Sequence, residues 1–222
     1  KLNLPANDSA QLTVTAQVKN GTDQPVKGKL KGRIENIDFD QDVELGPNEA
    51  KDVTFTPDKF SQLVVSNPRL WWPAQMGKPE LYKLAMEFDV NGSASDQSTT
   101  QFGIREITSD LNSVGGRAFH INGKNILIRG AGWTPDMMLR ENSQRLHDEI
   151  RYVKDMGLNT VRLEGKLETE EFYQLTDSQG ILVMAGWCCC DFWERWPRWK
   201  PEDFEIAKQS LRDQIYRLRS HP

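Results

Sequence analysis

The 222-residue sequence lacks several features that would narrow its function at once. It has no apolar run of the length that a membrane-spanning helix requires, and no concentrated basic stripe of the kind that nucleic-acid-binding surfaces need. The formal net charge is −4. We therefore predict no membrane segment and no nucleic-acid partner. A slightly acidic surface is compatible with a cationic ligand, although solubility alone is the commoner reason for it.

Cysteine and histidine are scarce, and their spacing excludes several kinds of site. The three cysteines are consecutive, Cys188 to Cys190, which rules out a disulfide framework and lacks the separated ligand pairs of structural zinc sites. The three histidines show no metal-ligand spacing either. We expect no metal and no cofactor, interpret the cysteines as packing residues, and leave their redox state open.

The first half of the sequence has the two-residue period of β-strands. Apolar residues occupy alternate positions from Leu12 to Val18, as in a strand with one buried face. Turn-forming residues then separate further short runs, at Lys29 to Ile34, Val43 to Leu45, Val53 to Phe55, Leu81 to Val90 and Thr99 to Ile104. This pattern predicts an antiparallel β-sandwich of about 100 residues.

After Ile107 the rhythm changes, so we place a domain boundary there and predict domains at 1–106 and 107–222. A hairpin with the turn Asn122-Gly123 is followed by alternating helical and strand patterns, which indicate a parallel sheet with crossover helices. The expected strands are the hairpin Ala118 to Ile128, Asn159 to Leu163 and Ile181 to Ala185. The first expected helix has an apolar stripe of Leu146, Ile150, Val153 and Met156 and is stopped by Gly157; the second runs from Glu170 to Asp177 and is ended by Gly180. The last starts near Pro201, with an apolar face of Phe204, Ala207, Leu211, Ile215 and Leu218.

Five segments resemble, in the same order, sequences of glycoside hydrolase family 2, which includes β-galactosidases, β-mannosidases and exo-β-D-glucosaminidases. They are NPRLWWPAQMGKPELY (67–82), FGIRE (102–106), INGKNILIRGAGWTPD (121–136), MGLNTVRLEG (156–165) and DSQGILVMAGW (177–187). The resemblance implies an immunoglobulin-like antiparallel β-sandwich followed by the N-terminal half of a (β/α)₈ TIM barrel. It assigns the first segment to the sandwich, with Trp71 and Trp72 packing at the junction of the two domains.

The run Arg-Leu-Glu-Gly at 162–165 and the loop GWCCCDFWERW at 186–196 are similar to those of exo-β-D-glucosaminidases. Enzymes of this subgroup remove glucosamine from the non-reducing end of chitosan oligomers. At Cys188 the loop departs from the pattern, where we expect Glu or another polar residue. Three Asn-x-Ser/Thr sequons, at Asn7, Asn20 and Asn91, weakly favour a secreted or periplasmic protein, although no leader sequence precedes Lys1.

Parallel strands of a barrel end at one mouth, where the active site lies. We therefore predict that three segments face this mouth, namely Trp133 and Asp136, Arg162 and Glu164, and Trp187 to Glu194. The resemblance implies that Arg162 hydrogen-bonds the nucleophilic carboxylate and keeps it ionised; the alternative is a solvated or salt-bridged arginine. Glu164 is predicted to pair with the C2 ammonium of glucosamine, a contact that neutral sugars cannot make.

The other predicted substrate-binding residues each have a structural alternative. Trp133 and Trp187 are candidate platforms for a sugar ring, but a large aromatic is more often part of a core. Asp136 and Asp191 are candidates to accept hydrogen bonds from sugar hydroxyls, or to cap the helices that follow them.

The predicted function is that of a retaining exo-glycosidase acting on chitosan or glucosamine oligomers. The resemblance puts both catalytic carboxylates beyond Pro222, so we expect no catalytic pair within the chain, an inactive chain in isolation, and a need for the rest of its own barrel. Two alternatives stay open: a β-mannosidase-type enzyme of the same family, and a non-catalytic carbohydrate-binding module.

Overall fold

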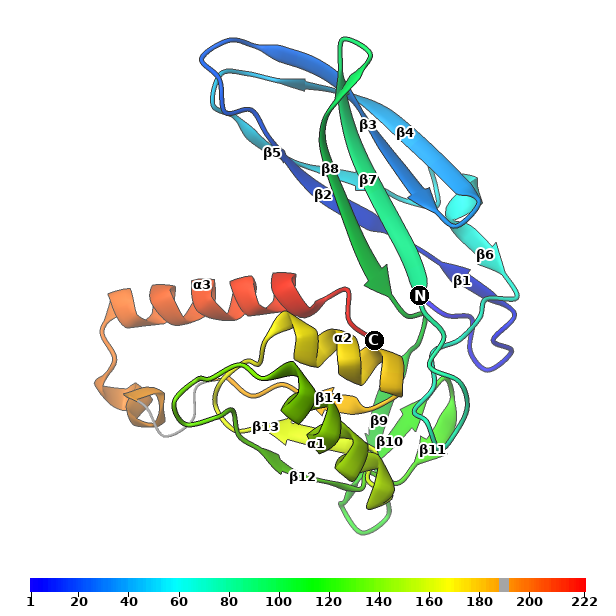
Figure 1. Ribbon diagram of the computed structural model, residues 1–222, viewed down its shortest axis with the longest axis vertical. Coiled ribbons are helices and arrows are strands. Elements are labelled where there is room, and N and C mark those ends of the chain that lie inside the picture. Colours follow the sequence, from blue (N-terminus) through cyan, green and yellow to red (C-terminus); the bar gives the residue numbers. More distant parts are fainter. Residues whose placement is uncertain (188–191) are drawn as a thin grey trace. The chain divides into compact units, whose positions relative to one another are not determined.

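The chain forms two compact units in the computed structural model, which describes residues 1–187 and 192–222 (Figure 1). The first unit contains Lys1–Arg69 and Leu81–Glu106, and the second contains Leu70–Glu80 and Ile107–Pro222. The boundary after Glu106 lies where the sequence period changes. The segment Leu70–Glu80, in contrast, joins the second unit, although its sequence assigned it to the sandwich.

The first unit is built from antiparallel strands in two main sheets. Phe39 and Phe55, from different sheets, contact each other with ring centroids 4.8 Å apart, so the sheets pack face to face, in agreement with the predicted β-sandwich. One sheet has the order β4 (Ile37–Leu45), β3 (Val26–Ile34), β7 (Tyr82–Val90), β8 (Ser93–Phe102). The other pairs β2 (Val14–Lys19) with β5 (Ala50–Phe55). In addition, β1 (Ser9–Gln11) pairs with β6 (Val64–Ser66), which follows the 3-10 helix η1 (Ser61–Leu63).

The outward face of the larger sheet carries a ladder of opposite charges across β3 and its neighbours. Lys29 Nζ lies 2.9 Å from Asp40 Oδ1, and Arg33 Nε lies 2.5 Å from Asp38 Oδ1. Cross-strand pairs of this kind favour one register over a slipped one. Within the first unit, all of which is described, Val64 is the one exposed large hydrophobic residue. This surface therefore presents charge and no aromatic ring.

The second unit combines a small antiparallel sheet with a parallel one. The antiparallel sheet has the order β11-β10-β9, and the parallel sheet has the order β12-β13-β14. In chain order the elements are β9 (Ile107–Leu111), β10 (Arg117–Ile121), β11 (Lys124–Ile126), β12 (Gly130–Trp133), α1 (Ser143–Asp155), β13 (Thr160–Leu163), α2 (Glu170–Gln179), β14 (Leu182–Met184), the 3-10 helix η2 (Phe192–Arg198) and α3 (Pro201–Leu218). The predicted hairpin, helices and parallel strands are thus confirmed, whereas η2 was not predicted.

Side-chain caps define where the helices begin. Asn142 accepts a hydrogen bond from the Arg145 backbone N–H at the start of α1, and Thr169 accepts one from Phe172 at the start of α2. Each cap satisfies one of the backbone donors that a helix leaves unpaired at its first turn. At the other end of α1, Met156 lies outside the helix and is 66% exposed, so the prediction that it continues the apolar stripe was wrong.

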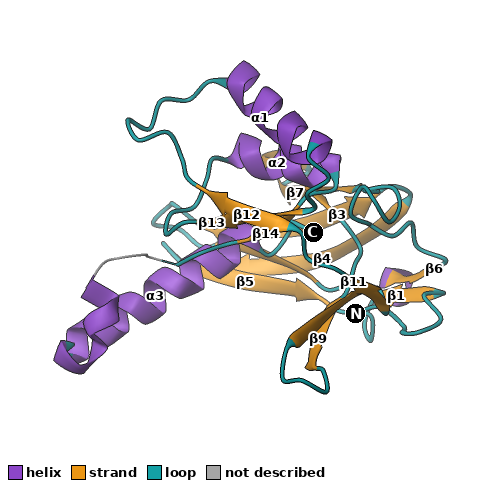
Figure 2. Cartoon of the chain, turned by 90° about the horizontal axis from the view of Figure 1, so that it is seen from below, coloured by secondary structure: helices purple, strands orange, loops and turns teal. Residues whose placement is uncertain are grey.

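Helices α1 and α2 lie on the same side of the parallel sheet, as Figure 2 shows. Their apolar side chains form one core with the central strand β13 and with Ile181. Buried members are Ile150, Val153, Val161, Leu163, Phe172, Tyr173, Leu175 and Ile181. Helix α3 contributes only Leu218 to the edge of this core, and Phe204, Leu211 and Ile215 on its predicted apolar face are exposed.

The segment Leu70–Glu80 belongs to the second unit because its side chains bond the ends of α1 and α2. The fully buried Trp71 donates its indole N–H to the Asp177 carbonyl at 2.7 Å. The Gln75 side-chain amide donates to the carbonyls of Gly157 and Leu158, at 3.0 and 3.1 Å. The Asp177 carbonyl lies in the last turn of α2, where carbonyls have no partner within the helix, and Gly157 and Leu158 directly follow the end of α1. Trp71 is thus a core residue of that unit.

His221 forms a buried ion pair that also holds the second unit together. Its Nδ1 lies 2.6 Å from Asp177 Oδ2, and the two side chains are only 13% and 7% exposed. The ring also packs on Tyr173, and Glu170 lies 3.6 Å from Nε2. Burial acts to lower the pKa of His221, but the hydrogen bond and charge of Asp177 outweigh it, so the pKa is raised from 6.5.

We predict that this pair makes the unit less stable as the pH rises. Because the pKa of His221 is higher in the folded state, its contribution is complete below about pH 6.5 and is lost as the pH rises through the folded value. Thermal unfolding between about pH 5.5 and 8.5 should show a midpoint that falls more steeply for the unmodified chain than for His221→Gln. Parallel profiles for the two proteins would contradict the assignment.

Candidate functional site

The alternation of side chains along β13 separates a core face from a polar face. Val161 and Leu163 are buried, at 3% and 0% exposed, against α1 and α2. Successive side chains of a strand point to opposite sides, so Arg162 lies on the other face. Its side chain is 57% exposed, and that of Glu164, which follows the strand, is 38% exposed. Arg162 and Glu164, the two candidates with the most specific predicted roles, therefore share one face.

Arg162 and Glu164 form an ion pair, with Nη1 2.6 Å from Oε2. The Glu164 backbone N–H donates to the Trp133 carbonyl at 3.0 Å, which fixes the position of the residue at the end of the sheet. The register partners of Arg162 are Gly132 on β12 and Met184 on β14. We call the surface formed by Gly132, Arg162, Glu164 and Met184 the Arg162 face.

Trp133 does not lie on the Arg162 face, although it ends β12 at the same carboxyl edge of the sheet as Arg162 and Glu164. It is in register with Leu163, so its side chain is on the helix side of the sheet. There its ring packs on Phe172, with centroids 5.2 Å apart, and its indole N–H donates to Glu168 Oε1 at 2.8 Å. These contacts favour the alternative in which Trp133 is an aromatic of the core.

Asp136 also lies on the helix side, where it organises the loop after β12. Its carboxylate accepts hydrogen bonds from Arg140 Nη2 and Arg145 Nη1, each at 3.1 Å, and from the Met138 backbone N–H at 2.9 Å. The bond from Arg140 is the main reason why the pKa of Asp136 lies far below its ordinary value. Since Asn142 caps α1, the prediction that Asp136 caps the following helix was wrong.

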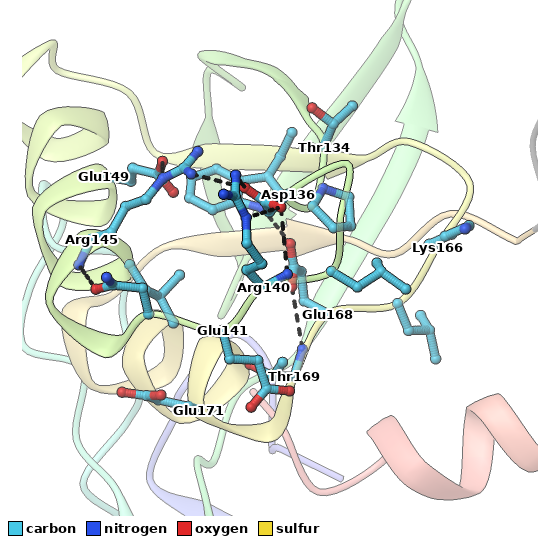
Figure 3. Close-up of a pocket in the computed structure, with 16 residues that line it drawn as sticks. Thr134, Asp136, Arg140, Glu141, Arg145, Glu149, Lys166, Glu168, Thr169 and Glu171 are labelled. Atoms are coloured by element: carbon cyan, nitrogen blue, oxygen red, sulfur yellow. Dashed lines mark hydrogen bonds and ion pairs between the residues drawn. The ribbon is translucent and has the colours of Figure 1, made fainter.

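Trp133 and Asp136 line a hollow of about 280 Å³ between the loops after β12 and β13 (Figure 3). In Figure 3 Arg140 and Arg145 both point toward Asp136, and Glu168 lies between the two loops. The Arg162 face is not part of this hollow. The other lining residues are Thr134, Pro135, Leu139, Arg140, Glu141, Asn142, Arg145, Leu146, Glu149, Lys166, Leu167, Glu168, Thr169 and Glu171.

The third predicted segment is described only in part. Trp187, which follows β14, directs its indole N–H toward Ser210 Oγ of α3 at 3.4 Å. Asp191 and the three cysteines lie outside the described residues. Among the residues that are described, no three His, Cys, Asp or Glu side chains gather as a metal site would require, and no helix is both long and apolar enough to span a bilayer.

Sequence reasoning missed Gly132 and Glu168. Gly132 had a usable signal, because glycine inside a strand often marks a close approach of a ligand or another backbone. Glu168 had none, because its partner Trp133 is distant in the sequence and the contact depends on how two loops fold.

The chain resembles known proteins over its whole length. Residues 1–105 match the family model described as glycosyl hydrolases family 2. Two exo-β-D-glucosaminidases, from Streptomyces avermitilis and Amycolatopsis orientalis, are 40% and 42% identical to this chain over all of its length. The chain belongs to glycosyl hydrolase family 2. It spans about a quarter of each relative, 25% and 22% of their lengths.

A solved structure also resembles this family 2 chain over its whole length. The crystal structure of the exo-chitosanase CsxA from Amycolatopsis orientalis matches all of the chain with a TM-score of 0.91 and 42% identity, over 26% of its own length. A variant of that enzyme with an alanine substitution has been solved in a complex with PNP-β-D-glucosamine.

We predict that Asp136→Ala loosens the loop after β12 in this family 2 chain. The substitution removes the acceptor shared by Arg140, Arg145 and the Met138 N–H, so amide hydrogen exchange at residues 137–141 should become faster. Acidification should have the same effect only well below pH 3.8, since the carboxylate of Asp136 stays charged at higher pH. Glu141→Gln, an exposed carboxylate on the same loop, is the control. Unchanged exchange in Asp136→Ala would show that other contacts hold the loop.

Proposed function

We propose that this chain is part of a retaining exo-glycosidase that removes β-1,4-linked D-glucosamine from the non-reducing end of chitosan oligomers. The observation that carries the proposal is the Glu164 carboxylate at the end of β13, beside Arg162. A carboxylate there gives the C2 ammonium of glucosamine a charge-assisted partner, which a neutral hydroxyl would use less well. The names of the two bacterial relatives support the same substrate.

We also propose that β12, β13 and β14 are the first strands of a (β/α)₈ barrel, preceded by an immunoglobulin-like sandwich. The three strands are parallel and neighbours in chain order, with helices between them, as such a barrel requires. Purely parallel sheets are normally covered on both faces, and in the described residues only one face of this sheet is covered by helices. In a barrel the Arg162 face would point inward.

In this proposal the bond-breaking groups come from the rest of the polypeptide. Retaining glycosidases use two carboxyl groups about 5 to 5.5 Å apart, one as acid/base and one as nucleophile. The role of this chain is to bind and orient. Arg162 carries five N–H donors, so it can hold Glu164 and still donate to a nucleophilic carboxylate, keeping that group ionised.

We predict that the chain of residues 1–222 alone does not hydrolyse β-glucosaminides. Without the catalytic pair of carboxyl groups, neither protonation of the leaving group nor covalent attack can occur. The measurement is release of p-nitrophenol from PNP-β-D-glucosamine by the purified chain, with the full-length enzyme as the positive control. Turnover by the isolated chain would show that it holds its own catalytic pair.

We predict that Glu164→Gln in the full-length enzyme lowers kcat/KM for β-glucosaminides. A charge-assisted hydrogen bond contributes about 1.5 to 3 kcal/mol, so the loss should be roughly 10- to 150-fold. Any activity on β-mannosides should change little, because their C2 hydroxyl carries no charge. Glu141→Gln, which removes an exposed carboxylate from the loop after β12, is the control. An equal loss on both substrates would contradict the proposed contact between Glu164 and the ammonium group.

The alternative of a non-catalytic carbohydrate-binding module finds less support. Such a module would need a sugar-binding surface on the sandwich, and aromatic faces are the usual platforms for pyranose rings. In the described first unit no aromatic side chain is exposed; Phe39, Phe55, Tyr82 and Phe88 are buried. The outward face of its larger sheet carries the charge ladder of β3.

A further inference from the structure

Strand β12 contains two glycines, and only one of them is required by the surrounding backbone. A Cβ atom on Gly130 would lie 2.5 Å from the Thr160 carbonyl oxygen, which no real side chain tolerates. Of the atoms in residues 1–187 and 192–222, a Cβ atom on Gly132 would meet Glu164 Oε2 alone, at 4.0 Å, an ordinary van der Waals distance. Among the described residues, packing therefore gives no reason for glycine at position 132.

Gly132 lies beside the two residues on which the proposed substrate contact depends. It is the register partner of Arg162 in the parallel sheet and shares its face. The corresponding neighbour on β14 is Met184, whose long side chain is 47% exposed. In the described part of the chain, the Arg162 face therefore carries a long side chain on its β14 strand and no side chain on its β12 strand. Glycine inside a strand weakens it, and often occurs where a ligand comes close to the backbone.

We propose that Gly132 is a specificity-determining residue, whose missing side chain makes room for the amino-sugar ring beside Glu164. The ring would lie over the β12 backbone, so that the C2 ammonium reaches the Glu164 carboxylate from the side opposite Met184. This inference rests on the proposed role of Glu164 as the partner of the ammonium group. It adds a steric requirement that charge alone does not supply.

The test uses the full-length enzyme with Gly132→Ala and Gly132→Val, measured on PNP-β-D-glucosamine and with free glucosamine as competitive inhibitor. Added methyl groups should displace the ring from Glu164, so KM and the inhibition constant should rise about tenfold for Gly132→Ala and about 100-fold for Gly132→Val. The thermal unfolding midpoint of Gly132→Ala should be equal to that of the parent or slightly higher, because glycine weakens a strand. If Gly132→Val does not fold, Gly132→Ala alone decides.

Ala131→Val is the matched control, because it adds bulk to the next residue of β12, which points to the other side of the sheet. Its KM and inhibition constant should be unchanged. Folded Gly132 variants with the parent KM and inhibition constant would overturn the proposal, and so would equal losses in Ala131→Val.

Glu164→Gln separates this inference from the proposed function. If Glu164→Gln loses affinity for glucosamine while the Gly132 variants do not, only the steric role of Gly132 fails. If Glu164→Gln keeps its full affinity, the ammonium contact fails, and the role proposed here for Gly132 fails with it.

Discussion

The alternation of side chains along β13 is the constraint on which the candidate site depends. Val161 and Leu163 have to face α1 and α2, because their burial completes the core of the second unit. Arg162 is then forced to the opposite face, where it meets Glu164. A slip of one residue in this strand would bury a guanidinium without a partner and expose two core residues, which is why the register is strongly specified.

The alternation along β13 separates a core face from a polar face because α1 and α2 are held in place over the core face. Trp71 bonds a carbonyl in the last turn of α2, and Gln75 bonds two carbonyls that directly follow α1. Both residues come from a segment that precedes the second half of the first unit in the sequence. The chain therefore leaves the first unit, bonds the ends of both helices, and returns to finish the sandwich. Such a bonding pattern makes the second unit depend on residues that no local pattern would assign to it.

The two faces of the parallel sheet have different surroundings. On the helix side, Asp136 and its two arginines organise a loop beside the hollow that Trp133 lines. On the other side, the Arg162 face presents one ion pair between a glycine and a methionine. An exposed ion pair adds little stability, which is compatible with the role in substrate binding that we propose for Glu164.

The sequence by itself determined what local periodicity can encode. The two-residue alternation of β2, the apolar stripe and end of α1, the helix ending at Gly180 and the buried strand at Val161 and Leu163 are all visible in the residues. Family membership was visible too, in motifs such as RLEG and GAGW. The tertiary structure alone decided the side of the sheet on which Trp133 lies, the partners of Asp136 and the unit to which Leu70–Glu80 belongs. Each of these depends on strand register or on hydrogen bonds between distant segments, and residue order along the chain carries no direct record of such contacts.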